Sequence, residues 1–520
     1  MLPLASVLGS LFAGGGETWA HLAATGLGRY VGNTALLLAG VACGVISMGV
    51  LSAWLVTAYR FPGRGVLEWA LMLPLAMPAY VMAYAYTDWL EFAGPVQSAL
   101  RAATGWEARE YWFPQIRSLG GAAAMLSLAL YPYVYLIART AFLELSRSAI
   151  EAGRLAGLSA WGAFWRVAVP LARPAIAAGA ALALMETLAD FGTVSYFALE
   201  VFTTGIFKAW ISMGDSVAAA QLSTCLLGFV VVVLALERAS RGRAAYAVST
   251  RRPAQPHRLQ GAKALAALAA CSLPVVFGFV LPAAILGVLA WDERIAGARL
   301  AALVGNSFWL AGLTAFVAVV LATLMAYAAR LTRSNMVAAA NRAASLGYAV
   351  PGAVIAVGVL VPLGRFDNLA GAWLEQAWGI KVGLLLTGSI VALVYAYVVR
   401  LLAVALQTMD AGLAKITPSM DDAARSLGAG PGSALARVHV PLLAPSLAAA
   451  ALLVFVDVLK ELPATLTLRP FNFDTLAVEA YNLAKDERLA EAAAPSLVIV
   501  AVGLLAVLFV TKRYFQATRS

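Results

Sequence analysis

One sequence pattern occurs twice in this chain, 271 positions apart (151 to 422). EAGRLAGLSAWGAFWRVAVP begins at position 151, and DAARSLGAGPGSALARVHVP begins at position 422. In both copies an acidic residue precedes an alanine, and a glycine, an arginine and a proline follow at the same spacing. Two in-phase copies in one very apolar chain indicate a duplicated membrane protein with one special loop in each half. The shared residues are Glu151, Ala152, Gly157, Arg166 and Pro170 in the first copy, and Asp422, Ala423, Gly428, Arg437 and Pro441 in the second.

The composition predicts an all-α polytopic membrane protein. Hydrophobic residues make up 62% of the chain and charged residues 12%, and the mean hydropathy is +0.82. Many stretches therefore reach the roughly 20 apolar residues that cross a bilayer. A β-barrel would show alternating segments of about ten residues, but stretches such as 217–236 and 301–329 are apolar on all sides. The net charge of +10 fits basic cytoplasmic loops better than nucleic-acid binding.

Hydropathy predicts eleven membrane spans and a short first helix. Residues 1–18 correspond to the end of the span at 263–290, so we expect twelve helices in two tandem six-helix repeats. The duplication predicts a first repeat at 1–240 with its special loop at 144–173, and a second repeat at 263–520 with its loop at 407–442. The predicted spans are 33–59, 66–90, 120–142, 171–194, 217–236, 263–290, 305–329, 337–362, 382–406, 443–467 and 495–512.

The basic residues predict the orientation of these spans. Of the 37 lysines and arginines, 24 fall on one side, 12 fall on the other, and Lys460 lies within a span. The positive-inside rule places the basic side, with both repeated loops and both termini, in the cytoplasm. Residues 241–262 are rich in arginine and contain two prolines, so they are predicted to be a basic cytoplasmic linker between the repeats.

The repeated loop has the features of a docking element. Its first part is predicted to be helical, Gly157 and Gly428 are expected to form sharp turns, and Pro170 and Pro441 are expected to begin the next membrane helix. Ordinary basic loops would explain the charge but not the shared spacing. At these residues the chain resembles the permease subunits of ATP-binding-cassette (ABC) importers, whose cytoplasmic EAA loop forms the coupling helix held by the ATPase. Gly153 and Asp422 depart from that motif.

The similarity extends to the fused, two-repeat permeases of the ferric-iron importer family. It rests on MLPLAMPAYVMAYAYTDWL (72–90), YPYVYLIAR (131–139), METLADFGTVSYFALEVFTTGIFKAW (185–210) and the segment 460–493. The resemblance implies a type I importer in the inner membrane of a bacterium, with two copies of a separate ATPase and an extracytoplasmic, periplasmic iron-binding protein as partners. Related permeases carry thiamine, polyamines, sulfate or phosphonates, so thiamine, a polyamine or another small solute is an alternative substrate.

The chain lacks the motif that ATP hydrolysis would require. A phosphate-binding loop ends in Gly-Lys-Ser/Thr, and the dipeptide Gly-Lys does not occur in this sequence. We therefore predict a transporter subunit rather than an enzyme, with no catalytic residue and no cofactor of its own, and with ATP and Mg²⁺ bound by the partner ATPase. A secondary transporter with parallel repeats remains an alternative, although it would not need the paired loops.

Four carboxylates within the predicted spans are candidates for the transport pathway. The 271-residue offset pairs Glu186 with Asp457 and Asp190 with Glu461, and each half has its two acids at i and i+4, on one helix face. Buried charges in membranes usually line a pathway, and hard oxygen ligands suit transient contact with Fe³⁺ as substrate. Alternatively, Lys460 neutralises one of them, or they satisfy backbone groups where the helices break near Gly192 and Pro463. Tyr80, Tyr84 and Tyr86 are further candidate oxygen donors.

The segments 91–119 and 468–494 are predicted to be long external loops with mixed charge and exposed aromatic residues. Their arginines are candidates for docking the carboxylates of a binding protein. Ordinary solvated charge is the alternative for these loops. The candidate docking residues are Arg109, Arg117, Arg469 and Arg488.

Overall fold

The computed structural model describes residues 2–12, 14, 16–107, 110–144, 155–241, 257–292, 297–332 and 334–517. Within these ranges the regular secondary structure is helical apart from two short strands, β1 (Tyr59–Arg60) and β2 (His257–Arg258), which pair in parallel. This pairing joins the end of the first long helix to residues within the predicted linker 241–262.

The first half contains a series of long helices separated by short ones. Its order in the chain repeats in the second half, except that one continuous helix, α18 (Gly352–Trp378), corresponds to α5 and α6. The elements are α1 (Leu2–Gly9), η1 (Ser10–Phe12), α2 (Glu17–Thr25), α3 (Leu27–Ala58), α4 (Arg64–Ala70), η2 (Leu73–Ala76), α5 (Ala79–Leu90), α6 (Pro95–Thr104), α7 (Leu119–Glu144), α9 (Ala160–Ala163), η3 (Phe164–Ala168), α10 (Val169–Ala189), α11 (Gly192–Tyr196), α12 (Phe202–Phe207), η4 (Lys208–Ser212) and α13 (Ser216–Arg241).

The second half follows the same plan but begins with a full-length membrane helix, where the first half has only the short helix α1. In both halves a five-residue π-helix precedes the helix that carries the candidate carboxylates. The elements are α14 (Gly261–Val275), η5 (Val276–Val280), α15 (Leu281–Asp292), α16 (Gly297–Thr332), α17 (Asn335–Ser345), η6 (Leu346–Ala349), α18 (Gly352–Trp378), α19 (Ile390–Leu413), α20 (Pro418–Ser426), α21 (Pro431–Ala434), η7 (Leu435–His439), α22 (Val440–Leu459), α23 (Pro463–Leu468), α24 (Leu476–Lys485) and α25 (Leu489–Ala517).

The predicted spans overlap the long apolar helices of the structure. In the described part of the chain, ten helices are long and apolar enough to cross a membrane, or eleven if one bent pair counts as a span. The expected short first helix is α1, and its eight residues would reach only about 12 Å at 1.5 Å per residue. The all-α architecture is as expected from hydropathy, and the described residues reach the predicted eleven full spans when the bent pair is counted as one.

Two predicted spans, 66–90 and 337–362, are wrong as continuous helices. The first is a pair of helical segments bent by 91° between Ala76 and Ala79. Met77 has an extended ψ of 105° and Val350 one of 125°, because each precedes a proline whose ring disfavours the α conformation at the residue before it. The same break therefore occurs in both halves, at Pro78 and at Pro351.

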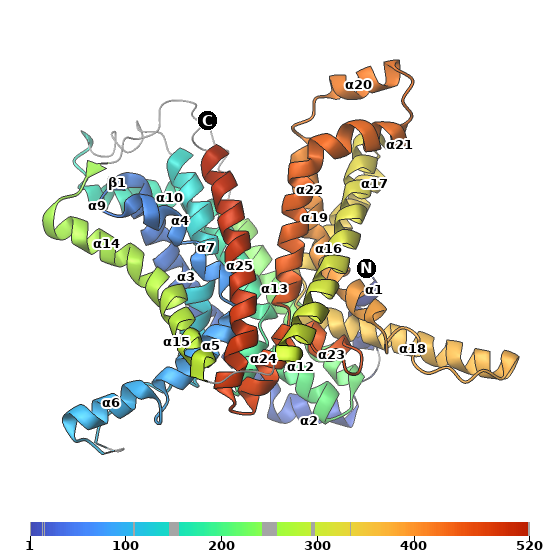
Figure 1. Cartoon of the computed structure of the whole chain (residues 1–520), viewed down its shortest axis with the longest axis horizontal. Coiled ribbons are helices and arrows are strands. Elements are labelled where there is room, and N and C mark those ends of the chain that lie inside the picture. Colours follow the sequence, from blue (N-terminus) through green and yellow to red (C-terminus); the bar gives the residue numbers. More distant parts are fainter. Residues whose placement is uncertain are drawn as a thin grey trace.

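The two halves exchange helices in space. One hydrophobic core combines α3, α5 and α7 of the first half with α14, α15 and α25 of the second. The other core combines α16, α19 and α22 of the second half with α1, α12 and α13 of the first. The lobes seen in Figure 1 therefore do not coincide with the two sequence repeats, because each takes its outer helices from the other half.

Small residues let the helices within a lobe approach closely. A Cβ atom at Gly49 of α3 would lie 2.7 Å from the Val134 side chain, and one at Gly179 of α10 would lie 2.7 Å from the Val134 Cα. Close backbone contact of this kind is a main source of helix association in membranes. The lobes lie apart at the end with α9 and α20 and come together at the end with α12, α23 and α24 (Figure 1). We call the first the loop end and the second the closed end.

Candidate functional site

The described parts of both repeated loops, with α9 in the first and α20 in the second, lie at the loop end of the molecule (Figure 1). In the second copy the predicted helix is α20, and its exposed residues include Asp422 and Ala423, while Ala424 is buried. Asp422 forms an ion pair with Arg425 one turn later on the same helix. In the first copy Glu151 and Ala152 lie outside the described residues. The second loop therefore presents a short polar helix, built from small residues, at the surface.

The two loop glycines form the sharp turns that the spacing predicts. Gly157 has φ of +87° and Gly428 has φ of +78°. These values belong to the left-handed region, which glycine adopts without the steric cost that other residues incur. Gly428 lies two residues beyond the end of α20, so its turn directs the chain away from the exposed helix.

The prediction that Pro170 and Pro441 begin the membrane helices is wrong. Both prolines are the second residue of an α-helical segment, but a π-helix and a further α-helical turn precede that segment. The continuous spans begin at Trp161 and Pro431. A proline inside a helix lacks an amide hydrogen and crowds the preceding turn, and the wider π-helical turn accommodates both effects. Arg166 and Arg437 lie in these π-helices and are exposed.

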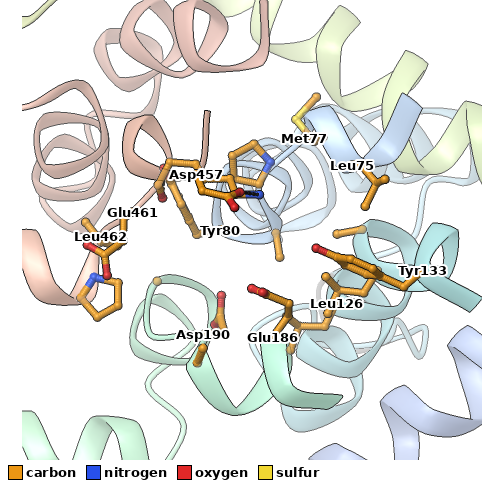
Figure 2. Close-up of a pocket in the computed structure, with 18 of the residues that line it drawn as sticks. Leu75, Met77, Tyr80, Leu126, Tyr133, Glu186, Asp190, Asp457, Glu461 and Leu462 are labelled. Atoms are coloured by element: carbon orange, nitrogen blue, oxygen red, sulfur yellow. Dashed lines mark hydrogen bonds and ion pairs between the residues drawn. The ribbon is translucent and has the colours of Figure 1, made fainter. Parts of the chain in front are cut away.

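A pocket lies between the two halves, where the carboxylate-bearing helices end. It has a volume of about 120 Å³ and is lined by α7, α10 and the η2–α5 break of the first half and by α19, α22 and η6 of the second. Figure 2 shows Glu186 and Asp190 on one wall, opposite Asp457 and Glu461 on the other. All four predicted pathway carboxylates therefore line one cavity, together with Lys460.

Two of these carboxylates cap the short helices that begin at Gly192 and Pro463. The expectation of paired acids on one helix face is therefore wrong, and the alternative of acids at helix breaks is confirmed. α10 ends at Ala189, and Asp190 Oδ1 accepts the backbone N–H groups of Thr193 and Val194 at 3.1 and 3.2 Å. Glu461 lies beyond the end of α22, where Oε1 accepts the Ala464 N–H and Oε2 the Thr465 N–H, both at 3.1 Å. Helix breaks expose unpaired backbone donors, which these acids satisfy.

The other two carboxylates have different partners. Asp457 forms an ion pair with Lys460 at 2.8 Å, as one alternative for Lys460 anticipated. Glu186 accepts a hydrogen bond from the Tyr348 hydroxyl at 3.0 Å. Its carboxylate is about a quarter exposed, and its nearest cationic atom, on Arg400, is 3.9 Å away. Glu186 is therefore the carboxylate with the weakest direct pairing in the described pocket.

Arg400 was missed as a pocket residue because sequence reasoning placed it among the basic residues of the loop end. It lies in the middle of α19, and its guanidinium is 3.4 Å from Glu461 and 3.9 Å from Glu186. It thus contacts one acid from each half. Tyr133 and Tyr348 also line the pocket and were missed. The position of Arg400 in the interior of the predicted span 382–406 is a sequence signal that could have identified it.

Of the three tyrosines predicted as oxygen donors, one lines the pocket. Tyr80 contributes to the wall, and its hydroxyl donates to the Lys460 carbonyl at 3.4 Å. Tyr86 donates to the Phe277 carbonyl, and Tyr84 packs edge-on against Tyr196, both away from the pocket lining. Among the described residues, no group of three or more histidine, cysteine, aspartate or glutamate side chains could hold a metal ion.

The candidate docking arginines of the closed end are engaged in ion pairs. Arg117 bridges Glu91 of the first half at 2.5 Å and Glu487 of the second at 2.9 Å. Arg488 pairs with Glu491 at 2.5 Å, and Arg469 pairs with Asp474. Arg109 lies outside the described residues. The described arginines therefore share their charge with acids of the same face, rather than standing alone as cations.

Known proteins with similar sequences are membrane components of transport systems, in agreement with this architecture. The family model described as "Binding-protein-dependent transport system inner membrane component" matches residues 45–241. The Fe(3+)-transport system permease protein FbpB 2 of Haemophilus influenzae is 27% identical over 94% of this chain and 90% of its own length.

Two relatives from Escherichia coli match shorter stretches. The sulfate transport system permease protein CysT is 32% identical over 36% of this chain and 66% of its own. The molybdenum transport system permease protein ModB is 25% identical over 37% of this chain and 82% of its own. Together with the duplicated helical architecture, these matches show that the chain belongs to the inner membrane components of binding-protein-dependent transport systems, as a multi-pass ABC importer permease with two repeats in one polypeptide.

Proposed function

We propose that this permease moves ferric iron across the inner membrane. The observation that carries the proposal is the pocket between the halves, where four carboxylates and three tyrosines stand against two cations in the described lining. Carboxylate and phenol oxygens are hard donors, which suit Fe³⁺. The excess of acids gives the cavity a potential that favours a cation. The similarity to an Fe(3+)-transport system permease over nearly the whole chain supports the same substrate.

Glu186 is the residue that we expect to meet the passing ion. Asp190 and Glu461 are committed to backbone amides, and Asp457 is committed to Lys460. A carboxylate with one phenol partner can exchange that hydrogen bond for a cation without leaving backbone donors unsatisfied. Glu186 is therefore the proposed contact, while the other three shape the pocket and its charge.

An oxyanion is the second candidate substrate. Arg400 and Lys460 could bind sulfate or molybdate, and permeases of both kinds are relatives of this chain. Each of these cations already faces a carboxylate, at 3.4 Å and 2.8 Å respectively, so an anion would have to displace an ion pair. Thiamine and polyamines are cations, and the acidic pocket favours them over anions for the same reason that it favours iron.

The rest of the transport cycle follows from the two ends of the molecule. We propose that the loop end faces the cytoplasm and that the two repeated loops, represented in the structure by α20 and Gly157, engage two copies of a separate ATPase. The docking of short helices into partner grooves is a common recognition mode, and small exposed residues allow close approach. A binding protein would then deliver iron at the closed end, beside Arg117, Arg469 and Arg488.

Substrate competition in a reconstituted complex tests the proposal. The permease is placed in liposomes with its ATPase and binding protein, and uptake of radiolabelled Fe³⁺, sulfate, molybdate, thiamine and putrescine is measured. We expect ATP-dependent uptake of iron and a marked reduction in the Glu186→Gln variant. Uptake of sulfate or molybdate without iron would replace the proposal by the oxyanion alternative, and uptake of an organic cation would replace it by that class.

A further inference from the structure

A partly buried polar cluster joins the exposed helix α20 to the membrane helices beneath it. Arg330, in the last turn of α16, donates from Nε and Nη2 to Asp421 Oδ2 at 2.9 and 2.7 Å. Its Nη1 donates to the Leu413 carbonyl at 2.8 Å and its Nη2 to the Ile416 carbonyl at 2.9 Å. The guanidinium thus ties the first turn of α20 to the carbonyl groups at the end of α19.

His439 completes this cluster from the side of α22. Its ring is fully buried, and Nε2 lies 2.6 Å from Asp421 Oδ1. Because a carboxylate accepts hydrogen bonds, Nε2 carries the hydrogen and donates it. Burial by itself would raise the pKa of Asp421, but the hydrogen bonds from Arg330 and His439 outweigh it and lower the pKa below its ordinary value. Asp421 is therefore a carboxylate held on both oxygens.

Tyr327 adds a second link one turn earlier on α16. Its hydroxyl donates to the Pro431 carbonyl at 3.0 Å, at the start of α21, and its ring packs against His439 with 5.0 Å between ring centres. The end of α16 therefore holds three segments that meet at the loop: the end of α19, the beginning of α20, and the α21–η7 turn that leads into α22.

We infer that Arg330, Asp421 and His439 form a clamp that transmits movement of α20 to the helices lining the pocket. α19 carries Arg400 into the pocket, and α22 leads to Asp457 and Glu461. A helix held only by flexible loops could tilt without moving them, but a helix tied by multiple charge-assisted hydrogen bonds moves with its partners. The inference deepens the proposed function, because it rests on α20 being the helix that engages the ATPase.

The sequence of the first half has none of the three clamp residues at the corresponding positions. At the 271-residue offset, Tyr59 stands in place of Arg330, Ala168 in place of His439, and Ile150 in place of Asp421. None of these side chains can form the same ion pair. The two ATPase contacts are thus connected to the pocket by different means, and the second repeat carries the polar one.

Hydrogen exchange of the permease alone tests the clamp without any partner. In the variants Arg330→Gln and Asp421→Asn, amide exchange in α20 should accelerate about tenfold or more, the factor expected for losing a charge-assisted hydrogen bond. Arg342→Gln, which removes an exposed arginine from the last turn of α17, should leave α20 unchanged. Exchange in α20 that is the same in all variants would overturn the inference.

Coupling measurements in the reconstituted complex test the transmission. Arg330→Gln should retain bound ATPase but transport at least severalfold less substrate per ATP hydrolysed. Arg330→Lys keeps the charge but forms fewer hydrogen bonds. Its transport per ATP hydrolysed should lie between that of Arg330→Gln and that of the native protein. Joining Arg330→Cys to Asp421→Cys with a short thiol cross-linker, in a background without the three native cysteines, should restore the ratio. An unchanged ratio despite faster α20 exchange would overturn the inference.

A separate cross-link keeps the inference distinct from the proposed function. Cysteine at Ala423, on the exposed face of α20, should be captured by a thiol cross-linker attached to the ATPase. Failure of this capture while ATPase remains bound would refute the assignment of α20 as the coupling helix. Capture together with an unchanged transport ratio in Arg330→Gln would refute the clamp and leave that assignment standing.

Discussion

Replacing Glu461 by glutamine should destabilise the permease, although the side chains have nearly the same size. Each oxygen of Glu461 accepts a different backbone amide, from Ala464 and from Thr465, and Arg400 lies 3.4 Å from Oε1. Glutamine offers one oxygen and one NH₂ group, so one buried amide meets another donor. Losing a hydrogen bond to a charged group costs about 1.5–3 kcal/mol, and weakening the partner of a buried arginine adds to this. We expect a loss of roughly 3 kcal/mol.

Asp190→Asn is the matched control for this change. Both backbone amides at that helix break are accepted by Oδ1 alone, and Oδ2 accepts the Thr193 hydroxyl. Asparagine can keep its oxygen on the two amides and turn its NH₂ group toward the hydroxyl, and it caps helices as well as aspartate does. We therefore expect a loss below about 1 kcal/mol, within the range of conservative changes at a satisfied cap.

Thermal unfolding in detergent and the yield of extracted protein measure the difference. Glu461→Gln should unfold at a clearly lower temperature than the native protein, and Asp190→Asn should remain close to it. Glu186→Gln should also unfold close to the temperature of the native protein, since glutamine can still accept the hydrogen bond of the Tyr348 hydroxyl. The effect of this substitution should instead be a lower rate of iron uptake. Equal stability of Glu461→Gln and Asp190→Asn would refute the argument from which oxygen serves which amide.

Three further predictions concern the loop end. Proline at Gly157 or Gly428 cannot adopt the observed positive φ, at a local cost of about 3 kcal/mol. Either variant should therefore abolish ATP-driven uptake while the protein stays in the membrane. Normal uptake in both variants would exclude the coupling role of the loops. A cysteine placed within 244–256 should react with an impermeant maleimide from the cytoplasmic side, and labelling from outside would invert the topology. Because the pKa of Asp421 is lowered from 3.8, the contribution of Asp421 to loop stability should be constant above about pH 4 and lost as the pH falls through the lowered pKa. Hydrogen exchange of the Asp421→Asn variant should lack this acid dependence. The same acid dependence in both proteins would contradict the prediction.

The exchange of outer helices bears on how the two halves move. α14, α15 and α25 belong to the second half by sequence but pack into the lobe of α3 and α7. A movement of that lobe therefore carries helices of both repeats, and the pocket lies where the lobes meet. Arg400 has an acid from each half nearby, so a movement of one half against the other would change its ion pairs.

Several features could be predicted from the sequence because they depend on neighbouring residues. The spans follow from stretches of apolar residues, which the bilayer requires to be helical. The turns at Gly157 and Gly428 follow from the freedom of glycine at positive φ. The repeated spacing indicates a duplicated membrane protein with one special loop in each half, since a shared pattern at a constant offset reflects a shared structural unit.

Other features were decided by the tertiary structure. Glu461 and Asp190 accept backbone amides three and four residues ahead, as the alternative of helix breaks near Gly192 and Pro463 predicted. Only the packing of the two halves places both acids in the wall of one pocket. Arg400 belongs to the pocket because α19 packs against α22, a contact between segments far apart in sequence. Spacing along a chain sets local conformation, whereas the partners of a buried charge depend on which helices meet, and here those helices come from both halves.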